Sequence, residues 1–258
     1  MTYSPSYRRM LNKLGYYNYH NALLNRNLNQ KGGWDSHCDR CRNYILKALD
    51  YYKPEKVTVL GSGWLLDLPL VEMAEKTGKV CLIDIIHPPE VISQTGTLRN
   101  VELSEEDVTG GLIEEVWQKA GKYSFFNKFK SLDDITLPEY SITGDPGLVI
   151  SLNILTQLEF LLIDFLKKRS VIREEEFNLF RSAIQKKHID FLKKHRSILI
   201  SDYAEVFLDK SGNTTTIPTL MTNLPHGQFK EEWTWQFEQT DNYLYNSTSV
   251  MKVIAISI

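Results

Sequence analysis

Short apolar runs alternate with amphipathic stretches from about residue 56 to residue 201. Residues 56–60 and 79–86 are rich in Val, Leu and Ile and predict strands, whereas residues 65–77 place apolar side chains at helical spacing. A strand–helix–strand unit of about 30 residues is typical of a parallel sheet with right-handed crossovers. The same alternation predicts three further strands, at 99–103 (weak), 145–153 (strong) and 197–201. It predicts helices at 112–119, 155–168 and 174–194, and an irregular connection at 121–144.

The pattern changes after residue 201. Residues 203–208 and 214–220 are β-prone and flank a turn at 209–213, which predicts a hairpin insertion at about 203–220. Trp233, Trp235 and Phe237 alternate with polar residues and indicate a half-buried strand. A terminal strand is expected at 251–258, and because only a loop joins these last two strands we expect an antiparallel pair.

These elements define the fold that we expect. Residues 34–258 form one α/β domain with a Rossmann-like, mostly parallel seven-stranded sheet, helices on both faces and an antiparallel strand pair at the C-terminal end. Residues 1–33 are rich in Tyr and Asn and predict an N-terminal helical cap or arm.

The most informative motif is Gly61-Ser62-Gly63, directly after the first predicted strand. A glycine turn lets the backbone pass close to a ligand, and a following helix would present free N–H groups. Asp84 ends the second apolar strand, where a carboxylate can accept both hydroxyl groups of an adenosine ribose. A dinucleotide site usually has a third glycine, but Leu66 stands at that position, which makes a pyrophosphate site less favoured.

On these residues the chain resembles the class I S-adenosylmethionine-dependent methyltransferases. The resemblance implies S-adenosylmethionine as the cofactor and methyl transfer to an acceptor, for which we expect a small molecule. It implies that the cofactor is bound by the glycine turn, by an acidic residue after strand two, by an acidic and an apolar residue after strand three, and by residues after strand four. These residues are Gly61, Ser62 and Gly63, then Asp84 and Ile85, then Asp107 and Val108, and lastly Ser151 and Asn153. Glu105 or Glu106 could be the acidic residue after strand three instead of Asp107.

The residues that face the acceptor are less well marked. Methyl transfer from a sulfonium requires orientation and exclusion of water, and a general base is optional, so no catalytic residue is assigned. Acceptor-facing residues are expected on loops and in the N-terminal segment. The candidates are Tyr16, Tyr19, Trp34, Tyr203 and His226.

Charge and apolar content limit the range of partners. The chain has 30 basic and 32 acidic residues and a net charge of -2, so no overall field attracts nucleic acid or anionic lipid. The apolar stretch 160–166 is too short to span a membrane and contains Asp164. Residues 1–9 lack the apolar core of a signal peptide, and three cysteines fit a reduced, cytoplasmic protein.

His37, Cys38 and Cys41 have the composition of a metal or redox site. No second C-x-x-C and no H-x-x-x-H motif accompanies them, so we expect core and helix-surface positions and no metal. Two other functions stay open: an NAD-dependent oxidoreductase, and a non-catalytic relative that binds S-adenosylmethionine or a protein partner. The oligomeric state is not defined by the sequence.

Overall fold

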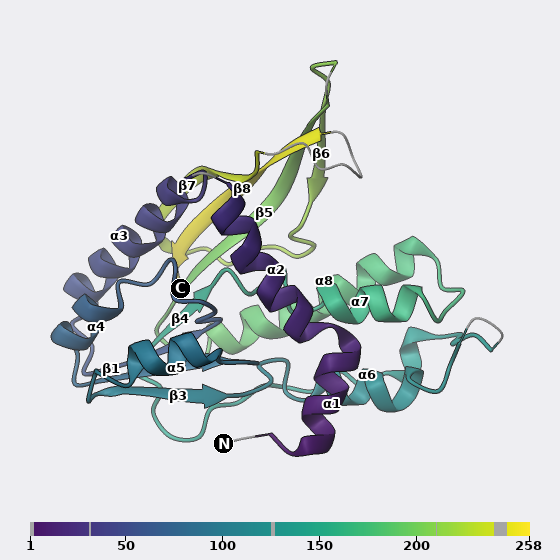
Figure 1. Ribbon diagram of the computed structural model, residues 1–258, viewed down its shortest axis with the longest axis horizontal. Coiled ribbons are helices and arrows are strands. Elements are labelled where there is room, and N and C mark those ends of the chain that lie inside the picture. The colour runs from purple at the N-terminus through teal and green to yellow at the C-terminus, as the bar shows by residue number, and fades with distance from the viewer. Residues whose placement is uncertain (1–2, 31, 125–126, 210, 240–246) are drawn as a thin grey trace.

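The computed structural model describes residues 3–30, 32–124, 127–209, 211–239 and 247–258. Within these residues the strands form one sheet in the order β3-β2-β1-β4-β5-β8-β7, with β6 paired to β5 outside this path (Figure 1). The strands are β1 (Lys56–Leu60), β2 (Lys79–Asp84), β3 (Val101–Glu105), β4 (Leu148–Leu152), β5 (Ser197–Asp209), β6 (Thr214–Pro218), β7 (Gln228–Glu238) and β8 (Ser247–Ser257). The helices are α1 (Pro5–Leu14), α2 (Tyr16–Asn29), α3 (Asp35–Tyr52), α4 (Leu70–Lys76), α5 (Pro89–Thr95), α6 (Leu112–Ala120), α7 (Phe160–Lys167) and α8 (Glu174–Leu192), with a short 3-10 helix at Leu132–Asp134.

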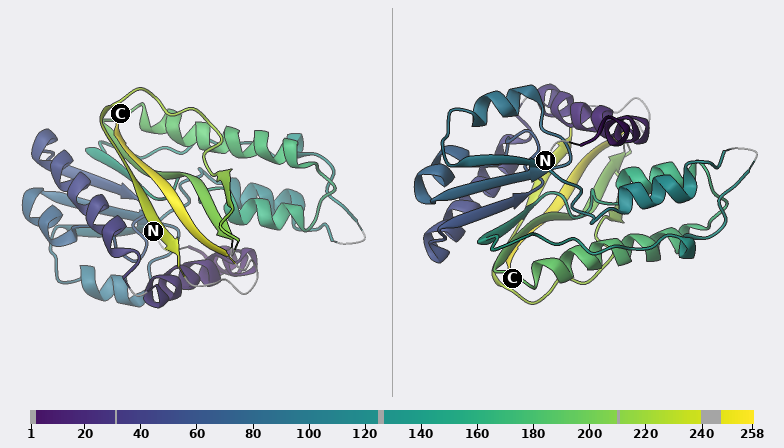
Figure 2. Two further views of the ribbon diagram at one scale, coloured as in Figure 1. Left: turned by 90° about the horizontal axis from the view of Figure 1, so that it is seen from above. Right: turned by 90° about the horizontal axis from the view of Figure 1, so that it is seen from below.

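The pairing confirms the predicted Rossmann-like sheet. β1 to β5 are parallel, whereas β8 runs antiparallel to both β5 and β7. Alternate residues of the inner strands enter two separate apolar clusters, with Val149 in one and Ile150 in the other. Helices α3 to α5 cover one face and α6 to α8 the other (Figure 2), as a parallel sheet requires. No described helix combines the length and apolarity needed to traverse a bilayer.

The predicted hairpin insertion is not a separate unit. β5 runs from Ser197 to Asp209, so the fifth strand and the first half of the hairpin are one strand, with a register irregularity between Asp202 and Ala204. Such a bulge bends a strand without ending it. β6 then pairs with the outer part of β5.

The loops after β1 and β4 are longer than expected. The helix predicted over 65–77 begins only at Leu70, because Leu65 has φ +62° and Pro69 occupies the N-cap. The helix predicted over 155–168 begins at Phe160, and Asn153 has φ +49°. Both loops lie at the carboxyl edge of the sheet, where their length leaves room for a ligand.

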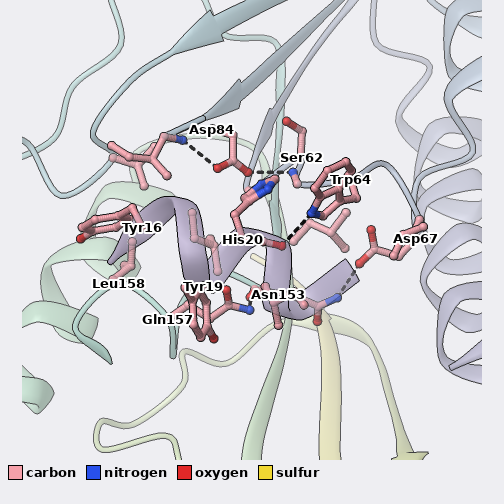
Figure 3. A pocket seen from close by; sticks show the side chains of 18 of the residues that line it. Tyr16, Tyr19, His20, Ser62, Trp64, Asp67, Asp84, Asn153, Gln157 and Leu158 are labelled. Atoms are coloured by element: carbon pink, nitrogen blue, oxygen red, sulfur yellow. Dashed lines mark hydrogen bonds between the residues drawn. The ribbon is translucent and has the colours of Figure 1, made fainter. Parts of the chain in front are cut away.

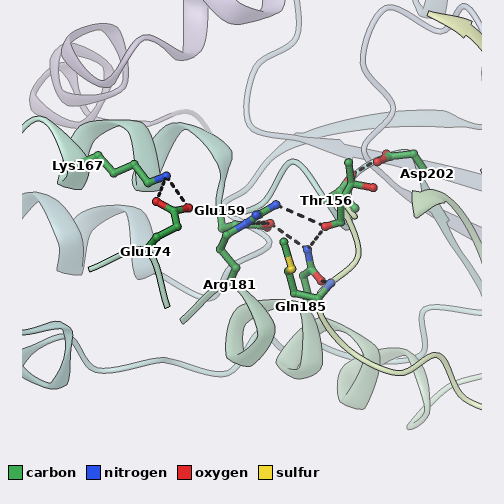
Figure 4. A network of polar contacts seen from close by, with 9 residues as sticks. Thr156, Glu159, Lys167, Glu174, Arg181, Gln185 and Asp202 are labelled. Carbon is green, nitrogen blue, oxygen red and sulfur yellow. Dashed lines mark hydrogen bonds and ion pairs between the residues drawn. The ribbon is translucent and has the colours of Figure 1, made fainter. Parts of the chain in front are cut away.

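A buried polar network holds the turn between β4 and α7 (Figure 4). Glu159 is fully buried and accepts hydrogen bonds from Arg181 Nε (3.3 Å) and Gln185 Nε2 (2.9 Å). Thr156 Oγ1 donates to Asp202 Oδ1 at 2.6 Å. Burial raises the pKa of Glu159 to about 7, although Arg181 acts in the opposite direction. The turn is therefore tied to α8 and β5 by side chains.

Candidate functional site

A pocket lies at the carboxyl ends of β1, β2 and β4, with α2 passing across it (Figure 3). In open α/β sheets, ligand sites lie outside the carboxyl ends of the strands. The position of the pocket therefore suits a ligand site.

The glycine turn and Asp84 meet in this pocket. Gly63 N donates to Asp84 Oδ2 and Ile85 N donates to Asp84 Oδ1, both at 2.7 Å. The predicted cofactor residues Gly61, Ser62, Gly63, Asp84 and Ile85 all line the pocket. Their contact unites the two predicted motifs in one site, which we call the Asp84 end and define as Ser62, Gly63, Asp84 and Ile85.

The two glycines have different tasks. Gly61 has φ +85°, and a Cβ atom there would lie 2.7 Å from the Leu152 carbonyl oxygen and 2.8 Å from Ile154 Cβ. Gly63 has φ +50°, but a Cβ atom there would meet no described atom within 4 Å. Gly61 thus allows the turn to pack against the end of β4, whereas Gly63 borders open space.

Asp107 and Val108 also line the pocket. Asp107 Oδ1 accepts from Thr109 N at 2.9 Å, and Oδ2 accepts from Tyr7 Oη at 3.5 Å. Burial raises the pKa of Asp107, and the hydrogen bonds to Thr109 act in the opposite direction. Asp107 therefore links the start of α6 to α1, and its role beside adenine stays a prediction.

Of the two residues predicted after strand four, only Asn153 reaches the pocket. Ser151 is fully buried, with its Oγ 2.8 Å from His188 Nε2, on the side of the sheet that α8 covers. Residues two apart on a regular strand face the same side, but Asn153 lies beyond β4 with φ +49°, where the chain turns. The structure therefore places Ser151 outside this pocket, and its role toward the cofactor stays a prediction.

Of the five residues predicted to face the acceptor, three line the pocket and two do not. Tyr16, Tyr19 and Trp34 line the pocket, whereas Tyr203 and His226 do not. Tyr203 lies at the irregularity within β5 and directs its hydroxyl group to Glu232 Oε2 at 3.4 Å. His226 is exposed in the loop before β7. Both residues lie outside this pocket, and their role toward an acceptor stays a prediction.

Several pocket residues were not predicted. They include His20, Leu23, His37, Trp64, Asp67, Gln157 and Trp235. Trp64 Nε1 donates to the His20 carbonyl oxygen at 2.8 Å, which attaches the middle of α2 to the glycine loop. Of these residues, Asp67 could have been found from the sequence, because it follows Gly61 by six positions in the same loop.

The end of the pocket opposite Asp84 is built from aromatic and polar side chains. We call this group, made of Trp34, His37, Asp67, Asn153 and Trp235, the Asp67 end. Trp235 stacks on His37 with ring centroids 3.9 Å apart and meets Trp34 edge-on at 4.7 Å. Asn153 Nδ2 lies 2.7 Å from Asp67 Oδ2 and 3.1 Å from His37 Nε2. Burial raises the pKa of Asp67, whereas the hydrogen bond from Asn153 lowers it.

The hydrogen bonds of His37 define its protonation. Trp233 Nε1, which can only donate, lies 3.1 Å from His37 Nδ1, so Nδ1 accepts a hydrogen bond and is unprotonated. Burial also lowers the pKa of His37 to about 3. His37, Cys41 and Asp67 place ligand atoms within 4.8 Å of one another, but a ligating histidine normally offers an unprotonated nitrogen to the metal and donates from the other. Here Nδ1 faces a donor, so this arrangement suits hydrogen bonding and not metal ligation.

Unpaired polar atoms gather in the pocket. Among the described residues, His20 Nε2, Ser62 Oγ, Asn153 Oδ1 and Trp235 Nε1 are buried and lack a hydrogen-bond partner, and all four residues line it. Unpaired buried polar atoms destabilise a folded protein, so their concentration at one place indicates a site for a polar ligand.

The charge of the pocket is one-sided. Four carboxylates line it, and among its described lining residues there is no Lys or Arg. The carboxylates are Asp67, Asp84, Glu106 and Asp107. The pocket therefore favours a cationic ligand over a phosphate.

No protein-family model matches the chain, and no curated protein matches its sequence. Several solved structures are similar to it in the course of the backbone. A Burkholderia thailandensis 1,6-didemethyltoxoflavin-N1-methyltransferase, described with its substrate and S-adenosylhomocysteine bound, has 8% identity and a TM-score of 0.42, with 100% of this chain and 92% of that chain covered. The N-methyltransferase NodS of Bradyrhizobium japonicum, in complex with S-adenosylhomocysteine, has 10% identity and a TM-score of 0.37 over 84% and 86%.

A complex of DhpI with S-adenosylhomocysteine has 10% identity and a TM-score of 0.35, with 95% of each chain covered. All three are described with S-adenosylhomocysteine. Their identities and TM-scores are too low to place the chain in a family. The function proposed below therefore rests on the geometry of the pocket.

Proposed function

We propose that this chain binds S-adenosylmethionine and transfers its methyl group to a small acceptor. The observation that carries the proposal is the hydrogen bond between Gly63 N and Asp84 Oδ2 inside the pocket. It brings the glycine turn and the acidic end of β2 to one place, as an adenosine ribose bound above the turn requires. Asp84 would hold the ribose hydroxyl groups, because each carboxylate oxygen accepts one backbone N–H and retains a second lone pair.

The charge and the unpaired atoms support the same ligand. S-adenosylmethionine carries a sulfonium and an ammonium group, and the pocket offers carboxylates without a described basic residue. Ser62 Oγ, in the loop after β1, and Asn153 Oδ1, in the loop after β4, are unpaired polar atoms that a ligand could contact. An NAD pyrophosphate would instead carry two negative charges into an acidic pocket, and β8 runs antiparallel where the dinucleotide-binding sheet has a parallel strand.

The residues around the pocket provide orientation and exclude water. When bound, S-adenosylmethionine supplies a methyl group that its sulfonium has already activated for displacement. Helix α2 covers the pocket with Tyr16, Tyr19 and His20, and Trp64 holds that helix on the glycine loop. Orientation alone contributes a large part of the rate when a reacting pair is held about 3–3.5 Å apart. The chain can therefore support transfer without a catalytic triad.

Thermal unfolding with added ligand tests this proposal. At a concentration of 100 times its dissociation constant, a ligand that binds the folded state adds about 2.7 kcal/mol of stability, which for a chain of this size raises Tm by about 5–10 °C. We expect this rise with S-adenosylmethionine and S-adenosylhomocysteine and not with NAD at the same concentration. Stabilisation by NAD alone would assign the chain to the oxidoreductases instead.

A further inference from the structure

Asp67 is a pocket carboxylate without a cationic partner. Its side-chain hydrogen bond is to Asn153 Nδ2, and among the described residues no Lys, Arg or His lies within ion-pair distance of it. Arg42 on α3 directs its guanidinium to the Leu66 carbonyl oxygen and to Asp39 Oδ1. Its charge lowers the pKa of Asp67, but it forms no ion pair with this carboxylate.

Two other neighbours of Asp67 carry no charge. His37 is neutral because Trp233 donates to its Nδ1. Burial raises the pKa of the Cys38 thiol to about 12, so that side chain is also neutral at physiological pH. The carboxylate is therefore available to form an ion pair with a cationic ligand.

Two independent features show that the Asp67 end is built to receive a ligand. Asn153 Oδ1 and Trp235 Nε1 are unpaired, and each residue is at least nine-tenths buried while lining the pocket. The walls there are aromatic, with Trp34 and Trp235 in edge-to-face contact. Aromatic rings attract cations and carboxylates bind N–H groups through charge-assisted hydrogen bonds, so the surroundings favour a nitrogen base.

The Asp67 end is also adjacent to the glycine turn. Asn153, which bonds to Asp67, follows β4 directly, and the neighbouring Leu152 and Ile154 are the residues that a Cβ atom on Gly61 would touch. A group held by Asp67 and Asn153 thus lies next to the part of the pocket assigned above to the methyl donor.

We propose, on the basis of the function proposed above, that the methyl acceptor is an amine, and that Asp67 binds its N–H group and receives its proton. The bound ammonium gives one proton to the Asp67 carboxylate, which frees the lone pair of the nitrogen. That lone pair forms the new bond to the methyl carbon, and the electron pair of the broken carbon–sulfur bond stays on sulfur. The methylated amine keeps the positive charge, and Asp67 releases its proton to solvent. Asn153 holds the carboxylate in place through its Nδ2 group.

The test compares a cationic and a neutral probe of the same size. The full-length protein is saturated with S-adenosylhomocysteine, and benzylamine or benzyl alcohol is titrated while tryptophan fluorescence is followed, since Trp34, Trp64 and Trp235 line the pocket. We expect the wild type to bind benzylamine at least about tenfold more tightly than benzyl alcohol, as a charge-assisted hydrogen bond implies. Asp67→Asn should lose this preference and bind the alcohol unchanged.

A matched control is Asp50→Asn, which removes an exposed carboxylate that does not line the pocket and should keep the preference. Equal affinities in the wild type, no binding of benzylamine, or a preference that survives in Asp67→Asn would each overturn the proposal.

Calorimetry with S-adenosylhomocysteine separates this proposal from the function itself. We expect Asp67→Asn to bind it within about twofold of the wild type. A wild type that does not bind it refutes the proposed function. A loss confined to Asp67→Asn would instead assign the carboxylate to the amino-acid end of the nucleoside, and the acceptor proposal would fail alone.

Discussion

The Asp84 end and the Asp67 end of the pocket are held together by different kinds of contact. Asp84 is fixed by backbone N–H groups of Gly63 and Ile85, which lie 21 positions and one position away in the chain. Asp67 is fixed by the side chain of Asn153, 86 positions away, and His37 by that of Trp233, 196 positions away. One end is a local backbone motif, whereas the other is assembled from distant elements.

This difference has a consequence for function. A backbone motif binds the part of a ligand that is the same in every reaction, because few side chains can alter it. The Asp67 end combines side chains from α3, from β7 and from the end of β4, so a substitution on any of these elements changes which groups it can bind. Such a site suits the acceptor, which differs between enzymes. The two ends should therefore respond differently to mutation.

The largest effect is expected at Gly61, where the Asp84 end meets β4. Gly61→Ala adds a Cβ atom 2.7 Å from the Leu152 carbonyl oxygen at φ +85° and should lower the free energy of unfolding by about 3–4 kcal/mol. Gly63→Ala, at φ +50° with open space around the new atom, should cost only about 1 kcal/mol. Urea denaturation measures both, and equal losses would show that the turn does not pack as described.

A second effect concerns Glu159, which supports the turn that carries Asn153. Its pKa is about 7 in the folded protein and 4.5 ordinarily, so the folded state holds the proton more tightly. Relative to Glu159→Gln, the wild type should therefore lose stability as the pH rises from about 4.5 to about 7, by about 3 kcal/mol in all. Urea denaturation across this range tests it, and parallel curves for the two proteins would contradict the burial of the carboxylate.

A third prediction separates the two ends by affinity. Asp84→Ala should weaken S-adenosylmethionine binding by about 1.5–3 kcal/mol, which is roughly 10- to 150-fold, because a charged acceptor of hydrogen bonds is lost. Titration calorimetry measures this, with Asp67→Asn as the comparison that should stay near the wild type. Equal losses in both variants would mean that the two ends bind one ligand.

The smallest effect is expected at Trp64. Trp64→Phe removes the hydrogen bond to the His20 carbonyl oxygen and should weaken the attachment of α2 by about 1 kcal/mol. Amide hydrogen exchange in α2 should then rise about fivefold, while exchange in α8 serves as the internal control. Unchanged exchange in α2 would show that other contacts hold the helix.

The features that depend on residues close together in the chain could be predicted from the sequence. The strands β1 and β2, the glycine turn and Asp84 follow from apolar periodicity and from one short motif, and the structure places them as expected. The late start of α4 was not predicted, because the apolar spacing over 65–77 alone does not show that Pro69 occupies the N-cap.

The Asp67 end could not be predicted in the same way. His37 was expected in the core or on the helix surface because no second C-x-x-C and no H-x-x-x-H motif accompanies it. Its partners Trp233 and Trp235 lie on β7, and nothing in the spacing reveals which strand faces α3. Ser151 and Asn153 were expected in one site, but the left-handed backbone at Asn153 breaks strand alternation without a glycine to signal it.

A crystal structure of the protein with S-adenosylhomocysteine tests the central claim most directly. The account predicts that both ribose hydroxyl groups lie within hydrogen-bond distance of the Asp84 carboxylate, above the turn at Gly61–Gly63, and that Asp67 is free of the nucleoside. A nucleoside bound elsewhere, or a ribose that does not contact Asp84, would contradict it.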